Sequence, residues 1–142
     1  MTSFSQAQAT LNVPFRFSAR HSLPSRPEPH QHTFQVTVSL RGPIAAETGM
    51  VIDILKVQPV LDEVRAPLEG QMLNGLPVLG DGPAPVNLAA KFPTCETLAR
   101  YFAWALDRRL APLLGAGARL ASVTVQLDDQ SQELGHAVLA LE

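Results

Sequence analysis

The sequence predicts an α+β domain in which a four-stranded antiparallel sheet carries two helices packed on one face. Three observations predict it. Both ends of the chain alternate apolar and polar residues, two central segments repeat apolar residues every three or four positions, and strands never alternate with helices. The expected order is ββααββ. A chain of 142 residues fits one domain, which we place at residues 1–142.

The first two strands are predicted from alternation with a period of two. Every second residue from Phe15 to His21 is apolar or histidine, and the same holds from His30 to Leu40. Half-buried strands show this pattern because successive side chains point to opposite faces. We expect the two strands to pair as a hairpin through the eight residues between His21 and His30.

The first helix is expected from about Lys56 to Leu68. Its apolar stripe consists of Val57, Val60, Leu61, Val64 and Leu68. Pro59 fits this helix only if it lies in the first turn, since proline donates no main-chain hydrogen bond. Residues 75–92 follow as a long loop that is rich in glycine and proline.

The second helix is expected to begin after Thr94, whose hydroxyl suits an N-cap, and to end before Gly115. Its apolar face consists of Leu98, Phe102, Ala105, Leu106, Leu110 and Leu113. Two short strands close the chain. We place them at residues 120–129, with Val123, Val125 and Leu127 on one face, and at residues 136–142.

Composition argues against several classes of partner. The chain has 11 basic and 13 acidic residues and a net charge of -2, without a long run of either sign, so neither nucleic acid nor a charged membrane surface is expected. No apolar stretch reaches the roughly 18 residues of a membrane span. One cysteine and an N-terminus without a secretory pattern predict a cytoplasmic protein. A small molecule or another protein is the expected partner.

Three of the four histidines lie in the predicted hairpin, at His21, His30 and His32. His30 and His32 are two residues apart on a strand, so they share a face about 6–7 Å apart. His21 ends the preceding strand, and pairing would bring all three imidazoles to one rim of the sheet. Three nitrogen ligands leave an open position on Zn²⁺, as in catalytic zinc sites. The alternative is that these are ordinary surface or capping histidines.

Several short motifs occur in the order seen in one known family. They are F-x-A-R-H-S-L, H-Q-H-T-F-x-V-x-V, G-M-V-I-D-I, L-N at residues 73–74, and P-T-C-E-T-L-A. From about Phe15 to its last strands the chain resembles the 6-pyruvoyltetrahydropterin and 6-carboxytetrahydropterin synthases. The resemblance implies a tunnelling fold, usually a hexamer whose sheets join into a barrel with active sites between subunits. It also implies 7,8-dihydroneopterin triphosphate as the substrate.

The resemblance further implies roles for individual residues. It makes His21, His30 and His32 the zinc ligands. The family holds the pterin ring with a T-x-E segment, matched here by Thr94, Cys95 and Glu96, and with a carboxylate that ends a late strand. A carboxylate accepts two hydrogen bonds from a pterin. Asp129 shares strand parity with Val123, Val125 and Leu127 and is the better match, while Asp128 is the alternative; both also fit a solvated turn.

The chain departs from the family pattern at its catalytic residues. The family's catalytic cysteine, four residues before the histidine pair, is Arg26 here, and the family's L-D-H-x-x-L-N appears as L-E-G-Q-M-L-N, with Glu69 and Gly70. Arginine does not deprotonate and glycine carries no proton, so neither serves as a base. Some family members use glutamate in place of the cysteine. Glu28 and Glu69 are therefore the candidate bases.

Arg26 and Cys95 are expected close to the metal site. Arg26, together with Arg20, is placed to receive a triphosphate, although exposed arginines at a strand end are also commonly solvated. The helix dipole can lower the pKa of Cys95 in the first turn. A small side chain at a helix start is the simpler interpretation of that cysteine, and its matched position in the family is a binding position.

Three functions remain compatible with the sequence. The first is a zinc-dependent carbon–oxygen (phosphate-eliminating) or carbon–carbon lyase that acts on a dihydropterin. The second is a non-catalytic homologue that keeps the fold and metal site and binds a pterin or another small ligand. The third is a relative that acts on a different small substrate, with the loop at residues 75–92 reshaping the pocket. A homo-oligomer is expected in each case.

Overall fold

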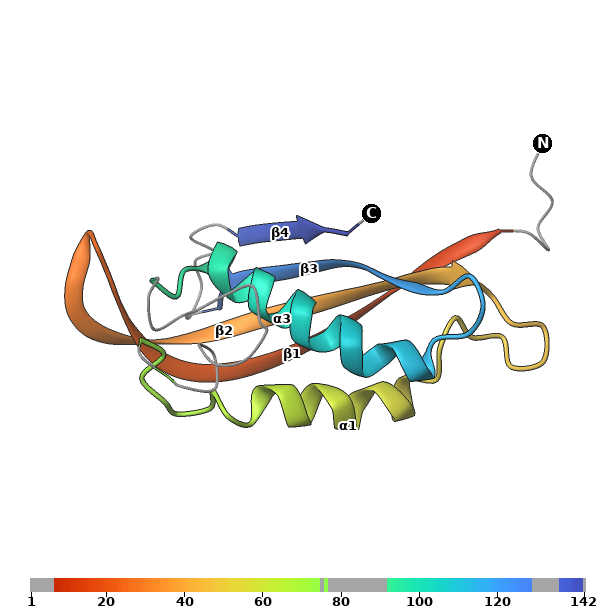
Figure 1. The fold of residues 1–142 in the computed structure, drawn as a ribbon, viewed down its shortest axis with the longest axis horizontal. Coiled ribbons are helices and arrows are strands. Elements are labelled where there is room, and N and C mark those ends of the chain that lie inside the picture. Colours follow the sequence, from red (N-terminus) through yellow and green to blue (C-terminus); the bar gives the residue numbers. More distant parts are fainter. Residues whose placement is uncertain (1–6, 75, 77–91, 129–135, 142) are drawn as a thin grey trace.

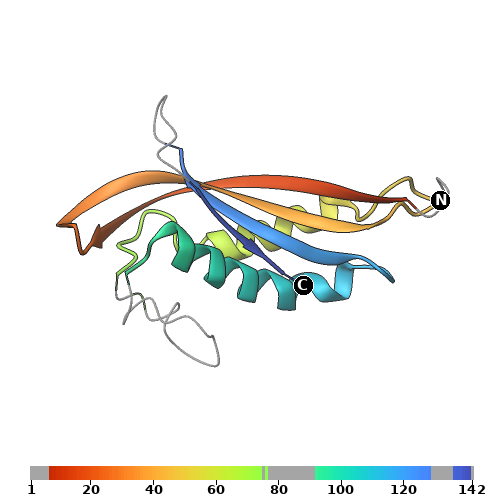
Figure 2. The same ribbon diagram turned by 90° about the horizontal axis from the view of Figure 1, so that it is seen from above.

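The sheet and the two helices form two layers, with both helices on the same face of the sheet (Figures 1 and 2). A computed structural model describes residues 7–74, 76, 92–128 and 136–141. In chain order its elements are β1 (Gln8–Leu23), β2 (Arg26–Pro43), α1 (Ile54–Arg65), α3 (Cys95–Leu110), β3 (Arg119–Leu127) and β4 (His136–Ala140). The sheet is antiparallel with the order β1-β2-β3-β4. The predicted class and the order ββααββ are confirmed.

The β1–β2 hairpin is longer than the sequence predicted. Leu23 pairs with Arg26, so the connection is a tight turn at residues 24–25, and the expected eight-residue connection is wrong. Pro27 and Pro29 lie in the part of β2 that extends past the last pairing with β3 at Phe34. The carbonyl of Thr33 accepts a hydrogen bond from the N–H of Asp128, directly after β3, so the main-chain groups of odd-numbered residues of β2 point towards the β3 side. A proline there removes no ladder hydrogen bond.

The core lies between the sheet and the two helices. From the strands it contains Val13, Phe15, Phe17, Ala19, Phe34, Val36, Val38, Leu40, Leu120, Val123 and Val125. Phe102 of α3 is fully buried against them, with its ring centre 5.4 Å from that of Phe15 and 5.7 Å from that of Phe17. The strand residues that the sequence predicted to be apolar therefore face the helices, and the polar residues between them lie on the open face of the sheet.

Helix α1 begins and ends earlier than predicted. Asp53 is its N-cap and accepts a hydrogen bond from the main-chain N–H of Leu55, and the helix ends at Arg65 instead of Leu68. Pro59 lies beyond the first turn, which contradicts the expectation for it. The missing N–H leaves the carbonyl of Leu55 without its helical partner, and Leu55 is 77% exposed, so water can take that place.

Helix α3 matches its prediction closely. The hydroxyl of Thr94 accepts a hydrogen bond from the N–H of Thr97, which confirms the N-cap. The predicted apolar face is buried along α3 from Leu98 to Leu110, whereas the predicted Leu113 lies beyond α3, half-buried in a short 3₁₀ helix, η2 (Ala111–Leu113). Within the part of the chain that the structure describes, neither helix has the length and apolar character that crossing a membrane requires.

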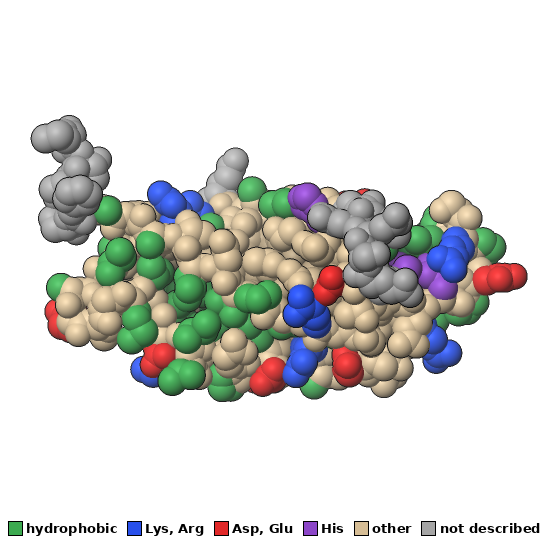
Figure 3. Space-filling view, turned by 180° about the vertical axis from the view of Figure 1, so that it is seen from behind, with side chains coloured by type: hydrophobic (Ala, Val, Ile, Leu, Met, Phe, Trp, Pro, Cys, Tyr) green, Lys and Arg blue, Asp and Glu red, His purple; other side chains and the backbone are tan. Residues whose placement is uncertain are grey.

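Figure 3 shows the open face of the sheet, where hydrophobic side chains lie among polar and charged ones. By strand parity with the buried core residues, Thr33, Thr37 and Thr124 are on this face. Arg16 and Asp128 form an ion pair there, with 2.6 Å between Nε and Oδ2. An exposed pair of this kind adds little stability.

Candidate metal centre

The three predicted histidines meet beyond the end of β3, on the helix-covered face of the hairpin. His21 of β1 is paired directly with His30 of β2, and His32 is paired with Ala19. The imidazole centres are 4.5 Å apart for His21 and His30, 4.8 Å for His30 and His32, and 5.2 Å for His21 and His32. One ring nitrogen from each lies within 4.8 Å of the others. The predicted convergence is confirmed.

His21 presents one ring nitrogen to the cluster. Its Nδ1 lies 3.0 Å from the carbonyl oxygen of Pro93, and because a carbonyl can only accept, Nδ1 carries the proton. The Nε2 of the neutral ring is then an acceptor. The side chain is 3% exposed, and this Nε2 is buried without a hydrogen-bond partner among the described residues. Leaving such an atom unsatisfied is costly, and a metal ion would satisfy it.

The electrostatics of His21 favour the form that binds metal. Burial lowers its pKa below the ordinary value; the Pro93 hydrogen bond opposes this, and the charges of His30, His32 and Arg26 add to the lowering. His21 is therefore neutral at neutral pH. A neutral imidazole is the form that coordinates a metal ion.

His30 repeats the arrangement on the neighbouring strand. Its Nδ1 lies 3.0 Å from the main-chain carbonyl of Glu28, so its Nε2 is also left as an acceptor. Metal-binding histidines usually donate their second N–H in this way, which orients the ring. Three imidazole nitrogens suit Zn²⁺ and similar divalent ions and leave a coordination position open. The residues present fit a metal ion.

A cavity of about 390 Å³ lies next to the cluster. Its lining residues are His21, Leu23, His32, Thr94, Cys95, Glu96, Leu127 and His136. The structure thus brings the T-x-E segment at the start of α3 to the same cavity as two of the three histidines. The volume falls within the range of small-molecule sites.

The hydroxyl of Thr94 has a structural role in this wall. It accepts the N-cap hydrogen bond of α3 at 3.2 Å from the N–H of Thr97, and its proton goes to the Thr97 hydroxyl 3.1 Å away. Its capping fixes where α3 begins, and the preceding carbonyl of Pro93 is the acceptor for His21. The start of α3 is therefore tied to the metal centre.

Cys95 is not an activated thiol. Burial and, to a smaller extent, the neighbouring Glu96 raise its pKa to about 11. The sequence allowed a lowering by the helix dipole, and these two effects outweigh it. In the cavity wall Cys95 is a protonated, half-buried side chain.

The two candidate bases lie in different surroundings. Glu28 is exposed on β2, two residues before His30 and of the same strand parity. Glu69 is bound to the outer edge of β1, where its Oε2 accepts a hydrogen bond of 2.9 Å from the N–H of Ser18. Gly70 next to it has a φ of +73° and donates to the carbonyl of Ser18 at 2.6 Å. Glycine adopts this left-handed conformation readily, which gives Gly70 a backbone role.

The structure describes only some of the residues that were predicted to contact the triphosphate and the pterin ring. Arg26 lies at the tip of the hairpin, exposed and near enough to His21 to affect its pKa. Asp129 lies outside the described residues. Its alternative, Asp128, forms the ion pair with Arg16 on the open face of the sheet and is not among the residues that line the cavity.

His136 is a cavity residue that the sequence reasoning missed. It begins β4 opposite Gln126, next to the end of β3, and lines the cavity with His21 and His32. The sequence contained a signal for it: His136 begins the last predicted strand, and an antiparallel last strand must start beside the end of the preceding strand.

Comparison with known proteins agrees with this arrangement. The family model described as 6-pyruvoyl tetrahydropterin synthase matches residues 10–132. The chain belongs to this family. A protein of Archaeoglobus fulgidus, provisionally assigned as a 6-carboxy-5,6,7,8-tetrahydropterin synthase, is 31% identical over 72 residues. That match covers 49% of this chain and 62% of the length of the relative.

Solved structures of the 6-pyruvoyl tetrahydropterin synthase family share the fold. The Caenorhabditis elegans synthase superposes with a TM-score of 0.72 at 18% identity, covering 99% of this chain and 100% of the other. The Plasmodium vivax synthase gives 0.67 at 17% identity, covering 95% and 99%. Two further structures are P. vivax variants in which a glutamate, described as a catalytic residue, is replaced by alanine or cysteine.

The raised pKa of Cys95 predicts slow alkylation. Because the thiolate is the reactive form and the pKa is about 11, metal-free protein should react with iodoacetamide at pH 8 at least about tenfold more slowly than free cysteine. The rate should continue to rise above pH 10. Mass spectrometry over a pH series measures it, and the urea-unfolded chain is the control. A plateau near pH 8 would contradict the raised pKa.

Proposed function

We propose that this member of the 6-pyruvoyl tetrahydropterin synthase family is a zinc-dependent lyase acting on a dihydropterin such as 7,8-dihydroneopterin triphosphate. The observation that carries the proposal is the buried, unpartnered Nε2 of His21, aimed into a cluster with His30 and His32 beside a cavity of suitable size. A site of oxygen ligands would suit other metal ions, whereas three imidazole nitrogens suit zinc.

The ligands in this proposal are His21, His30 and His32. When bound, the zinc ion would polarise oxygens of the substrate side chain and so acidify the adjacent C–H or weaken a C–C bond. The protein contributes the orientation of the rings, through the carbonyls of Pro93 and Glu28.

The cavity wall supplies the recognition of the ring. Glu96 lies in the first turn of α3, where its carboxylate is exposed next to Cys95 and the N-cap. A carboxylate there can accept two hydrogen bonds from the amino group and a ring N–H of a pterin. Thr94 and Cys95 complete the T-x-E segment, and Asp129 remains the proposed second carboxylate. Arg26 at the hairpin tip is proposed to receive the triphosphate.

Glu28 is the better candidate for the base. It shares strand and parity with His30, whereas one carboxylate oxygen of Glu69 is already bonded to the main chain of β1. The P. vivax relative, in which a glutamate is described as catalytic, supports a glutamate in this role. Arg26 and Gly70 stand where the family pattern has its cysteine and histidine, so the proton transfer must use other side chains.

The same two replacements favour a second candidate function. A homologue without turnover would keep the metal centre and cavity and bind a pterin as a ligand. Calorimetry with a set of pterins distinguishes the two functions, because tight binding without product formation indicates the non-catalytic homologue. Turnover of 7,8-dihydroneopterin triphosphate, or of a different small molecule that fits the cavity, indicates the enzyme.

His32→Ala should lower the affinity for zinc by more than about 100-fold, because it removes a direct ligand and even outer-shell changes often cost that much. Elemental analysis and competition with a chromophoric chelator measure the effect. His136→Ala is the matched control, since His136 lines the cavity without belonging to the cluster. Unchanged zinc content in His32→Ala would rule out the ligand set.

Glu28→Gln should lower kcat by about 100-fold or more while zinc binding is retained, as expected for loss of a general base. Glu69→Gln is the comparison, because its amide oxygen can still accept the hydrogen bond from Ser18. Steady-state turnover of 7,8-dihydroneopterin triphosphate checks both. Full activity of Glu28→Gln with loss in Glu69→Gln would assign the base to Glu69.

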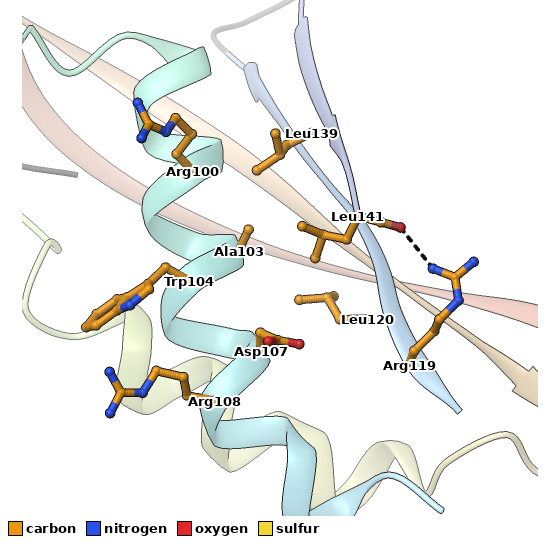
Figure 4. A pocket seen from close by; sticks show the side chains of 9 residues that line it. All are labelled: Arg100, Ala103, Trp104, Asp107, Arg108, Arg119, Leu120, Leu139 and Leu141. Atoms are coloured by element: carbon orange, nitrogen blue, oxygen red, sulfur yellow. Dashed lines mark hydrogen bonds between the residues drawn. The ribbon is translucent and has the colours of Figure 1, made fainter. Parts of the chain in front are cut away.

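We also propose that the chain functions as a homo-oligomer, a hexamer by family analogy. β4 pairs only with β3 in the described sheet, which leaves its other edge available. Beside it, a hollow of about 700 Å³ lies between α3 and the strands β3 and β4 (Figure 4). Ala103, Leu120, Leu139 and Leu141 form its apolar part.

The polar part of this hollow is basic. It carries three arginines, including Arg108 at 5.0 Å over the ring of Trp104, and a single carboxylate, Asp107. The chain as a whole has a net charge of -2, so the residues outside the hollow sum to a net negative charge. Trp and Arg are common at the centres of protein interfaces. These features favour a second copy of the chain as the occupant.

Light scattering of the wild-type protein should therefore give a mass well above the 15.3 kDa of one chain. Leu139→Asp, which places a charge among the apolar residues of the hollow, should shift the mass towards the monomer. Val138→Asp is the control on the same strand, because Val138 is 57% exposed. A monomeric wild-type protein would contradict the proposal.

A further inference from the structure

The outer edge of β1 beside the metal centre is paired with a short segment, residues 69–74, which we call the edge segment. The N–H of Arg20 donates to the carbonyl of Gln71 at 2.8 Å, and the N–H of Leu73 donates to the carbonyl of Arg20 at 2.8 Å. Gly70 and Glu69 bind Ser18. The edge segment thus follows β1 along the residues that lead to His21.

The edge segment ends at a side chain that holds the residue after His21. The Oδ1 of Asn74 accepts a hydrogen bond of 2.9 Å from the N–H of Ser22, and its Nδ2 donates one of 3.2 Å to the carbonyl of Ser22. Both main-chain groups of Ser22 are therefore bound by one carboxamide. Asn74 is partly buried, which reduces competition from water.

This contact lies at the irregular point of the hairpin. The β1–β2 register shifts between His21 and Leu23, so the regular ladder ends at the pair of His21 and His30. Ser22 has no partner in the β1–β2 register, and its N–H and carbonyl are bound by Asn74 on the outer edge of β1. The ring of His21 is held separately, by the carbonyl of Pro93 at its Nδ1.

We propose that Asn74 is a positioning residue of the metal centre. By holding Ser22 it fixes the main chain of β1 at the bulge, and this keeps the Nε2 of His21 directed towards His30 and His32. The inference rests on the proposed function, in which these histidines bind a metal ion. It assigns a role to a side chain that contacts neither the metal ligands' rings nor the cavity.

The effect of removing the carboxamide should be local. The edge segment keeps its main-chain hydrogen bonds to Ser18 and Arg20 without Asn74, and the buried Leu73 keeps it packed on the core. Only the last attachment, at Ser22, is lost. Affinity for the metal should therefore fall while the fold is retained.

The test measures zinc affinity of the full chain by competition with a chromophoric chelator. Asn74→Ala and Asn74→Leu both remove the two hydrogen bonds, and each should bind zinc about 10- to 100-fold more weakly than wild type, the usual effect of losing a residue that orients a metal ligand. Cobalt(II) absorption provides a second measurement, because its visible bands report the geometry of the ligands. Two variants of different size guard against a packing defect in either one.

Asn12→Ala is the matched control. Asn12 is also an asparagine of the β1 edge region, and its Oδ1 accepts a hydrogen bond of 2.6 Å from the hydroxyl of Ser39, far along the strand from His21. It should lose stability in urea without loss of zinc affinity. Circular dichroism confirms that each variant is folded under the conditions of the metal titration.

The outcomes separate the two proposals. Zinc affinity of folded Asn74→Ala within about twofold of wild type, or an equal loss in Asn12→Ala, would overturn the positioning role and leave the metal site intact. If the wild-type protein bound neither zinc nor cobalt, the proposed metal centre would fail, and the role of Asn74 with it. A selective loss in both Asn74 variants supports the role.

Discussion

The register of the β1–β2 hairpin is the constraint on which the rest of the site depends. It places His21 opposite His30 and puts His32 on the same face, continuous with the stacked pair of Phe17 and Phe34, whose ring centres are 5.0 Å apart. A slip of one residue would turn the two β2 histidines to the open face of the sheet. Burial of the phenylalanines therefore also enforces the geometry of the metal centre.

The convergence of the histidines needs support from outside the hairpin. β2 continues past the last described pairing with β3 at Phe34, so among the described strands only β1 and β2 carry the cluster. The start of α3 approaches from the core side through Pro93, and the edge segment supports β1 through Asn74. A hairpin tip is marginally stable alone. These two attachments connect the histidine cluster to the rest of the fold.

Some features of the site follow from local sequence patterns, and others depend on which strands are neighbours. The convergence of the three histidines and the N-cap at Thr94 could be predicted, because strand parity and helix capping are local rules. The ion pair of Asp128 with Arg16, the edge binding of Glu69 and the place of His136 in the cavity could not. Each depends on which strands are neighbours, and residues 16 and 128 meet only through β2 and β3.

The sequence by itself determined the class of the fold, the order of its elements, and the three histidines on one face of the hairpin, because these follow from periodicities of two and of three to four residues. Only the tertiary structure decided that the hairpin turns at residues 24–25, that the pKa of Cys95 is raised, and that Asn74 holds Ser22. Burial and pairing of distant segments set these features, and no local pattern encodes the distance between residues 22 and 74.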